Sequence, residues 1–384
     1  MKRSTYDIMV LSCLILKLIE GFYLNMNKND KRVRFPVSLV IAMIGGILFS
    51  IIHTPIPWLL GAMVSIFIGA RFGKIQLYWP SGVRNAGLII VGYSIGLSFT
   101  KSTLLQILKQ LPTMLLMTVL LVAFCAGIAY VVSKLTAVDY PTVLTGSIPG
   151  GLSQMIIFAE EVKGIDITTV TFLQVARLMM IIFFVPFLIF GPFFRSTVAS
   201  STGELIHTVQ TANTSIVWLA ILCIICAFLA KKLKFPTPFL LGPILGTAIV
   251  NISGLHGPAL PASILDLSQF MIGGYIGLLL KPEKLQHKAR VITLALISGM
   301  VMILGSLGLS LLLVFQEHIT ASTSFLSVAP GGMDQMGILA HEVHADLSMV
   351  TGFQLFRLFF IYFAVPPLLR LFFKKSMRKT ARTS

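Results

Sequence analysis

Two short polar segments stand out in this chain because they have nearly the same sequence. The first is Pro149-Gly150-Gly151-Leu152-Ser153-Gln154-Met155, and the second, at a numbering offset of 181, is Pro330-Gly331-Gly332-Met333-Asp334-Gln335-Met336. Proline removes a backbone donor and glycine permits non-helical dihedral angles, so each segment should break a helix. Inside a membrane, unwound backbone is tolerated only where protein buries it or water reaches it. A duplicated break therefore indicates a binding or translocation site.

Ser153 and Asp334 occupy the same place in the two segments, where a short oxygen side chain can cap the start of a helix. Free amides at a helix start attract anions, and the unwound carbonyls before them attract cations. Gln154 and Gln335 add polar groups at matching depth. The alternative is a kink that only lets helices pack closely. We expect solute contact, with Asp334, which has no charged counterpart, as a proton or sodium carrier.

A second repeated pair is Gln174-x-x-Arg177 and Gln354-x-x-Arg357, whose spacing of three places both side chains on one helix face. Arg177 lies nine residues beyond Thr168, about 13 Å of helical rise, which is too deep for its side chain to reach water. Such an arginine must be paired or must line a wet cavity. One alternative is a clamp for a carboxylate or another anion. The other is an internal ion pair, of Arg177 with Glu161 or Asp166 and of Arg357 with Glu342 or Asp346.

His341, Glu342 and His344, with Asp346, resemble a metal cluster at first sight. A zinc hydrolase helix needs histidines four residues apart, and these are three apart. We interpret them as solvated loop charges, with a pH-sensitive gate as the alternative. The pattern predicts no metal, no cofactor and no catalytic residue.

Cys223-x-x-Cys226 has the spacing of a redox or metal pair, but it has no second pair and lies in an apolar segment, as do Cys13 and Cys125. We predict small buried side chains in a lipid-embedded helix and no disulfide framework.

The composition requires a membrane protein. The 384 residues are 56% hydrophobic and 11% charged, with a mean hydropathy of +0.90, which a soluble domain does not reach. A bilayer core is about 30 Å thick, and most of the long apolar runs could cross it as helices. These runs are 37–52, 111–132, 178–194, 215–230, 291–315 and 353–373.

The net charge of +16 lies between the apolar runs. With alternating sides, 21 Lys and Arg residues fall on one face and only Lys101, Lys109 and Arg195 on the other. This asymmetry predicts a multi-pass protein of the cell inner (cytoplasmic) membrane with a cytoplasmic C-terminus. A nucleic-acid partner is not expected, because no segment is long enough for a soluble reading module.

The repeat extends beyond the breaks. At an offset of 181, Pro55-x-Pro57-x-Leu59-Leu60-Gly61 matches Pro236-x-Pro238-x-Leu240-Leu241-Gly242, and Gly92-x-x-x-Gly96 matches Gly273-x-x-x-Gly277. One residue is then lost, and the Gln-x-x-Arg pairs match at an offset of 180. Agreement over about 130 residues indicates an internal duplication. The paired glycines predict close helix packing.

Each half is predicted to have five crossings plus the broken segment, which dips in and returns. An odd number of crossings inverts the second half, giving inverted repeats in an all-α polytopic membrane protein. If the break crosses fully, the repeats are parallel. The predicted parts are an N-terminal segment (1–35, a short span or interfacial helix), repeat 1 (36–194), an extracytoplasmic linker (195–214), repeat 2 (215–373) and a basic cytoplasmic tail (374–384).

These duplicated motifs resemble the AbrB family of membrane proteins, and the resemblance covers about residues 36 to 373. It implies a duplicated membrane domain. The family takes its name from regulation of AidB expression, and its members also carry an ammonia monooxygenase label. It is unrelated to the soluble DNA-binding regulator of the same name. The sequence fits neither label well, because it repeats no metal-ligand set and contains no DNA-reading module.

The predicted function is an ion-coupled secondary transporter of a small solute and not an enzyme. Gln154, Gln335, Arg177 and Arg357 would contact the solute, which the arginines favour as an anion. No ATP-binding motif is present, so a gradient of H⁺ or Na⁺ would drive transport. The other expected partner is the lipid bilayer, and a homo-oligomer fits the sequence. The alternative is a membrane sensor or regulator of gene expression that binds a solute without moving it.

Overall fold

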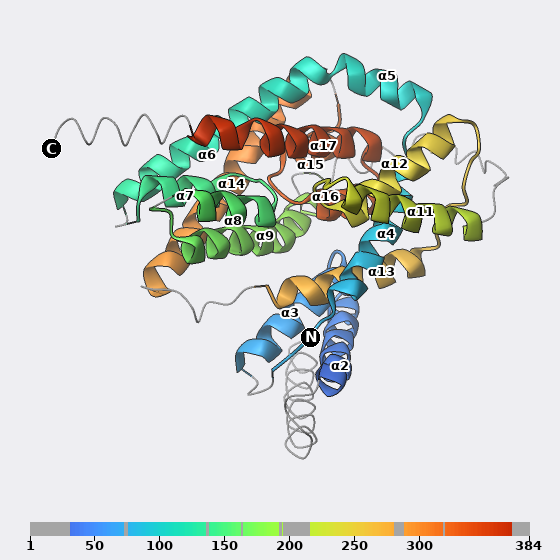
Figure 1. Cartoon of the computed structure of the whole chain (residues 1–384), viewed down its shortest axis with the longest axis horizontal. Helices are drawn as coiled ribbons and strands as arrows, with labels where there is room; N and C mark the ends of the chain where they lie inside the picture. Colours follow the sequence, from blue (N-terminus) through green and yellow to red (C-terminus); the bar gives the residue numbers. More distant parts are fainter. Residues whose placement is uncertain are drawn as a thin grey trace. The chain divides into compact units, whose positions relative to one another are not determined.

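The computed structural model describes residues 31–72, 76–135, 138–162, 164–191, 194, 216–279, 288–317 and 319–370. Within these ranges all regular secondary structure is α-helical, which confirms the predicted all-α class (Figure 1). The predictions for residues 1–30, the linker 195–214 and the basic tail concern parts of the chain outside these ranges.

The helices of the first half are α2 (Lys31–Ile51), α3 (Pro57–Phe72), α4 (Ser81–Leu97), α5 (Lys101–Lys109), α6 (Leu111–Leu135), α7 (Tyr140–Ser147), α8 (Leu152–Glu161) and α9 (Ile167–Ile189). Those of the second half are α11 (Ile216–Lys232), α12 (Pro238–Ile252), α13 (Ala262–Gly277), α14 (Lys288–Glu317), α15 (Ala321–Val328), α16 (Met333–Glu342) and α17 (Leu347–Phe363). Helices α7 and α15 have eight residues each, and α8 and α16 have ten each.

Among the residues that the structure describes, four helical segments are long and apolar enough to cross a membrane: Val33–Ile51, Leu111–Leu135, Ile167–Ile189 and Ala295–Glu317. A fifth results if α4 and α5, which are bent by 89°, form one broken span. Three apolar helices are shorter, at Pro57–Arg71, Pro238–Ile252 and Leu347–Phe363. The chain is therefore a multi-pass membrane protein, as predicted. Five crossings in each half and their inverted order stay predictions.

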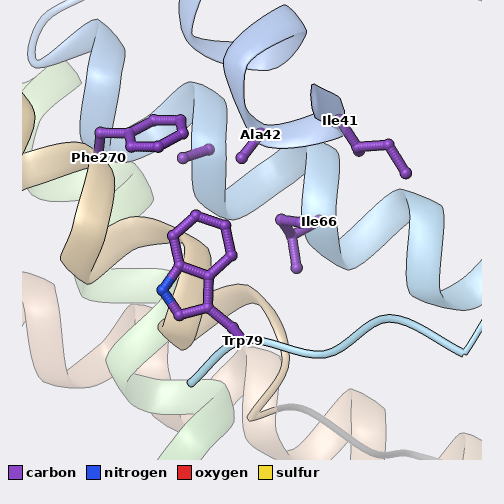
Figure 2. Close-up of a cluster of buried hydrophobic side chains, with 6 residues drawn as sticks. Ile41, Ala42, Ile66, Trp79 and Phe270 are labelled. Atoms are coloured by element: carbon purple, nitrogen blue, oxygen red, sulfur yellow. The ribbon is translucent and has the colours of Figure 1, made fainter. Parts of the chain in front are cut away.

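The chain divides into two compact units, and the first comprises residues up to Ser94 together with Ala259–Leu280. Its apolar core joins α2, α3 and α13 around the Trp79 ring (Figure 2). Trp79 stacks edge-on against Phe270 and donates its indole N–H to the Met271 carbonyl at 3.1 Å. The indole thereby fixes α13 against the segment that leads into α4, and it satisfies its own polar group.

Paired glycines let helices approach closely, as the sequence predicted. In the first unit, a Cβ added to Gly277 on α13 would lie 2.5 Å from the Met63 carbonyl oxygen on α3. A Cβ added to Gly273, also on α13, would lie 2.4 Å from the Leu59 carbonyl oxygen on α3. In the second unit, a Cβ on Gly96 would lie 2.9 Å from the Ile244 carbonyl oxygen. Backbone contact at these positions explains the glycines without any chemistry.

The second unit comprises Ile95–Pro258 and the chain from Lys281 onward. Helices α7 and α8 pack along α9, and α15 and α16 pack along α17 (Figure 1). Both groups contact the long helices α6 and α14. Their common core includes Met114, Leu313 and Phe353. Both Pro-Gly-Gly segments and both Gln-x-x-Arg pairs therefore belong to this unit.

The cysteine pair of α11 has a packing role in the same unit. Cys223 is 1% exposed, and its Sγ lies 3.3 Å from the Thr247 hydroxyl on α12. The Cys226 backbone faces Gly242, where a Cβ would strike its carbonyl oxygen. Cys223 is therefore buried as predicted, whereas Cys226 is only partly buried. The lipid-embedded position of the helix stays a prediction.

We predict that Gly273→Ala and Gly277→Ala destabilise the protein by about 1–3 kcal/mol each, because α3 and α13 must separate to admit the methyl group. The matched controls are Gly127→Ala and Gly308→Ala, which lie inside α6 and α14 with no atom within 4 Å of the added Cβ. Thermal unfolding of the purified chain in detergent measures the difference. Equal melting temperatures for all four variants would contradict the packing.

Candidate solute-binding site at two broken helices

The two breaks form where the sequence predicts them. Helix α7 ends at Ser147, and the extended residue Ile148 (φ −65°, ψ 128°) precedes Pro149. Helix α15 ends in the same way before Ala329 (φ −50°, ψ 131°) and Pro330. A proline disfavours helical dihedral angles in the residue before it, which explains both ends. The chain resumes a helix after Gly151 and after Gly332, and neither helix start has a side-chain cap.

At the first break, Gln174 and Arg177 bind the carbonyl end of α7. Gln174 Nε2 donates to the carbonyls of Thr145 (2.9 Å) and Ile148 (3.0 Å). Arg177 Nη1 donates to the carbonyls of Ser147 and Ile148, both at 2.9 Å, and its Nη2 donates to Gln174 Oε1 at 2.6 Å. The last carbonyls of a helix have no intrahelical donor, so these side chains supply what the break removes.

The second break repeats this arrangement. Gln354 Nε2 donates to the Leu326 carbonyl at 2.8 Å, and Arg357 Nη1 donates to the Ala329 carbonyl at 2.7 Å. Arg357 Nη2 donates to Gln354 Oε1, as in the first half, and also to the Gly331 carbonyl at 2.7 Å. The Arg357 guanidinium therefore reaches two residues further into the second break than Arg177 reaches into the first.

Among the described contacts, the charge of each arginine is partly offset by backbone carbonyls and not by an acidic side chain. Arg177 is 8% exposed and Arg357 is 5% exposed. A helix C-terminus carries about half a negative charge, and each guanidinium lies on one, at α7 and at α15. Each buried cation is thus paired with a partial charge and with charge-assisted hydrogen bonds.

The predicted ion pairs are not found among the described contacts of these arginines. Asp166 accepts from the Thr168 and Thr169 amides (3.0 and 3.2 Å) and so caps the start of α9. Asp346 caps α17 through the Met349 amide (3.0 Å). Glu161 pairs with Arg370 at an exposed site, and Glu342 is the last residue of α16. Helix starts attract these aspartates because their free amides are the nearest donors.

The two breaks belong to the same unit, and each lies against a helix of the opposite half. A Cβ on Gly150 would lie 3.0 Å from the Ile361 side chain on α17, and one on Gly331 would lie 3.1 Å from the Ile181 side chain on α9. Each break therefore contacts the arginine helix of the opposite half, four residues after the arginine. The two guanidinium groups and the buried Cys125 side chain on α6 lie within electrostatic range of one another.

Gln154 links the two halves directly. Its Nε2 donates to the Tyr362 carbonyl on α17 at 2.8 Å. That carbonyl has no helical donor because the residue four positions later is Pro366. Pro186 leaves the Ile182 carbonyl on α9 without a helical donor in the same way. Gln335, however, does not bind that carbonyl among the described contacts, and its Nε2 donates to the adjacent Asp334 carboxylate at 2.8 Å. The two glutamines therefore differ in their contacts although their positions match.

Three polar side-chain atoms at the breaks are buried without a hydrogen-bond partner: Gln154 Oε1, Arg177 Nε and Gln335 Oε1. Buried polar groups are normally satisfied by protein or water, so atoms like these need an explanation such as water or a ligand. The structure places Gln154 and Arg177 at the first break and Gln335 and Arg357 at the second, and their contact with a solute stays a prediction. The side chain of Ser153 lies outside the described part.

The histidines of the suspected metal cluster lie at the end of α16, His341 within it and His344 just after it with a left-handed φ of 52°. In the part of the chain that the structure describes, no three His, Cys, Asp or Glu residues come together as metal ligands.

Two polar contacts in the structure were not predicted from the sequence. Asn251, 7% exposed, donates to the carbonyls of Leu97 (2.7 Å) and Phe99 (2.9 Å), where α4 bends into α5. Glu317 accepts from the Thr113 hydroxyl at 2.7 Å and ties the end of α14 to α6. Neither residue has an identical residue at the equivalent position of the other half. The internal duplication therefore did not indicate that they are important.

The fold and the site define an all-helical, multi-pass membrane protein with two broken helix pairs. The chain belongs to the AbrB family: the family model described as "Transition state regulatory protein AbrB" matches residues 58–373. This confirms the resemblance seen in the motifs.

Two relatives align over most of the chain. The Bacillus subtilis (strain 168) protein named "Uncharacterized protein YhjN" is 29% identical over 90% of this chain and 95% of its own length. The Escherichia coli (strain K12) protein named "Putative regulator AbrB" is 25% identical over 86% of this chain and 94% of its own length.

We predict that Arg177→Lys and Arg357→Lys each lower the free energy of unfolding by about 2–5 kcal/mol, because one ammonium group cannot bridge the carbonyls and the glutamine that the planar fork holds. The control is Arg370→Lys, whose ion pair with Glu161 is exposed and should contribute less than about 1 kcal/mol. Thermal unfolding in detergent compares the three. A lysine variant as stable as the control would contradict the structural role of the arginine.

Proposed function

We propose that the protein is an ion-coupled secondary transporter of a small anionic solute, and that the solute binds where the two Pro-Gly-Gly breaks meet. The observation that carries this proposal is the group of unpartnered buried atoms at the breaks, Gln154 Oε1, Arg177 Nε and Gln335 Oε1. Polar atoms left open at the centre of an apolar helical unit are expected where a polar solute or water passes.

Charge favours an anion. Two guanidiniums and the uncapped starts of α8 and α16 converge in this region, and all four carry positive charge. The carbonyl ends of α7 and α15 offset only part of it. The acidic side chain at the breaks is Asp334, in the first turn of α16. A solute with one or more negative charges would complete the balance.

The matching geometry of the two halves supports a duplicated design. Equal helix lengths around each break and the same Gln-Arg contacts are expected when one unit has been copied. If the copies are inverted, the two breaks enter from opposite sides, and exchange of their contacts would expose the solute to each side in turn. Asp334 is the candidate carrier of the driving H⁺ or Na⁺, because its charge is unmatched by Ser153.

A sensor that binds a solute without moving it is the second candidate. The name of the Escherichia coli relative describes a regulator, and transport of a signal or its detection could each alter gene expression. The two functions predict the same binding site and differ only in flux.

Flux into proteoliposomes separates them. We expect the reconstituted chain to take up at least one radiolabelled small anion under an imposed H⁺ or Na⁺ gradient. Gln154→Leu should reduce the rate at least tenfold, because it removes the contact between the break and Tyr362. Gln106→Leu, on the amphipathic helix α5, is the matched control and should keep the rate. Binding without flux under any gradient would favour the sensor.

The predicted orientation has a separate test. Single cysteines placed between Ser196 and Asn213, in a chain whose four native cysteines are replaced, should react with a membrane-impermeant maleimide added from outside intact cells. A cysteine in the tail 374–384 should react only after the cells are opened. The opposite pattern would contradict the inverted arrangement of the halves.

A further inference from the structure

We propose that Asp334 and Gln335 form a proton-binding pair at the second break, in which the neutral acid and the amide make two hydrogen bonds with each other. This inference rests on the proposed function and deepens it in two ways. It names H⁺ rather than Na⁺ as the driving ion, and it identifies Gln335 Oε1 as the acceptor of the bound proton.

The structure contains one of the two hydrogen bonds and the two atoms of the other. Gln335 Nε2 donates to Asp334 Oδ2 at 2.8 Å. Gln335 is 3% exposed, and its Oε1 has no hydrogen-bond partner among the described atoms. This oxygen lies against the position that a Cβ would take on Gly332, and Asp334 Oδ1 lies 2.6 Å from the same position. The amide oxygen and the second carboxyl oxygen are therefore neighbours.

A proton between these two oxygens would complete the pair. An ionised carboxylate only accepts hydrogen bonds, and so does an amide oxygen, so the two repel each other while the acid is charged. A proton that forms an O–H bond with Asp334 Oδ1 can donate to Gln335 Oε1, while Nε2 still donates to Oδ2. The buried amide is then satisfied at both ends. The proton comes from water on one side of the membrane and returns to water on the other, so no further reactant is needed.

The first half shows that the repeat does not require this pairing. Gln154, the counterpart of Gln335, follows Ser153 instead of an acid, and its Nε2 donates to the Tyr362 carbonyl of the opposite half. The equivalent carbonyl for Gln335 is that of Ile182, which it does not bind among the described contacts. Gln154 Oε1 is also unpartnered, but the residue before it has no carboxyl group. The pairing with an acid is therefore specific to the second break.

Two arginines lie near the pair on neighbouring helices. Helix α16 packs against α17, where Arg357 Nη2 donates to the Gly331 carbonyl at 2.7 Å, next to Gly332. Arg177 lies one turn before Ile181 on α9, and the Ile181 side chain would lie 3.1 Å from a Cβ on Gly331. The arginines oppose binding of a proton, whereas the hydrogen bond to the amide oxygen favours it. Opposing influences let the pair both load and release the proton.

The other elements that pack on α16 contribute few ionisable groups. Helix α15 has none, and the part of α4 within this unit, from Ile95 to Leu97, has none. The remaining ionisable residues on the helices involved are His341 and Glu342 in the last turn of α16, Tyr362 on α17, and Cys125 on α6 within electrostatic range of both arginines.

The surroundings fit a proton better than a sodium ion. A hard metal cation takes several oxygen ligands at once. The carbonyls of the second break nearest to the pair, those of Ala329 and Gly331, already accept from the cationic Arg357. A proton needs only the two oxygens that Asp334 and Gln335 provide.

Infrared spectroscopy of the full chain in an uncharged detergent tests the pair directly. We expect the C=O stretch of a protonated carboxylic acid near neutral pH, and it should shift when aspartate carries a carbon-13 label. Asp334→Asn should lose this band yet keep the fold, because its amide can make the same two hydrogen bonds. The control is Glu317→Gln, whose carboxylate accepts from Thr113 and Gln110 and should not contribute to the band.

Gln335→Leu tests the partner of the acid. The band should move to higher wavenumber, because the acid C=O loses its amide donor, or it should disappear. An unchanged band in this variant would overturn the inference. So would the absence of the band from the wild-type chain at every pH at which it stays folded, a measurement that needs no variant. A melting temperature that Na⁺ raises in the wild type but not in Asp334→Asn would place a metal ion at the acid instead.

The outcome is separable from that of the proposed function. An acid band that Asp334→Asn removes, in a chain that shows no anion flux, would uphold the pair and reject the transporter. Flux driven by a Na⁺ gradient alone, in a chain without the band, would uphold the transporter and reject the pair. Flux that follows the H⁺ gradient in the wild type, and is independent of it in Asp334→Asn, would support both.

Discussion

A guanidinium group buried among apolar helices must find a compensating charge, and in this protein it finds one at the end of a broken helix. Arg177 and Arg357 each bind the terminal carbonyls of a helix of eight residues. The break creates free carbonyls that only a donor can satisfy, and the buried arginine needs acceptors that only a break supplies. The two elements depend on each other. This mutual dependence explains how irregular backbone can be stable inside an apolar helical unit. It also determines where polar side chains can lie.

The sequence was informative where the physics is local. Proline and glycine end helices through their own dihedral limits, so both breaks could be placed to the residue, and the spacing of glutamine and arginine predicted their common face. The partner of each arginine could not be predicted, because a backbone carbonyl leaves no trace in residue type. Acids near Arg177 looked like partners, yet Asp166 was taken by the amides of its own helix. Contacts made by one half only, such as those of Asn251, were missed because duplication was the main signal.

Differences between the halves carry as much information as their likeness. The arginines and their glutamines bind the end of the preceding helix in both halves, and Arg357 alone adds a described bond to the Gly331 carbonyl. The glutamines of the breaks differ more. Gln154 crosses to Tyr362, and Gln335 stays with Asp334. A copied unit that was needed only for packing would have no reason to place an acid, Asp334, in one copy and a neutral serine, Ser153, in the other.

The most direct test of the central claim is an electron cryo-microscopy map of the purified chain with and without succinate. The account predicts that the guanidiniums of Arg177 and Arg357 lie on the carbonyl ends of α7 and α15 in both maps. It also predicts ligand density at the two breaks, beside the glutamines and arginines, only when succinate is present. A map in which either arginine pairs with an acid side chain, or in which succinate binds away from both breaks, would contradict it.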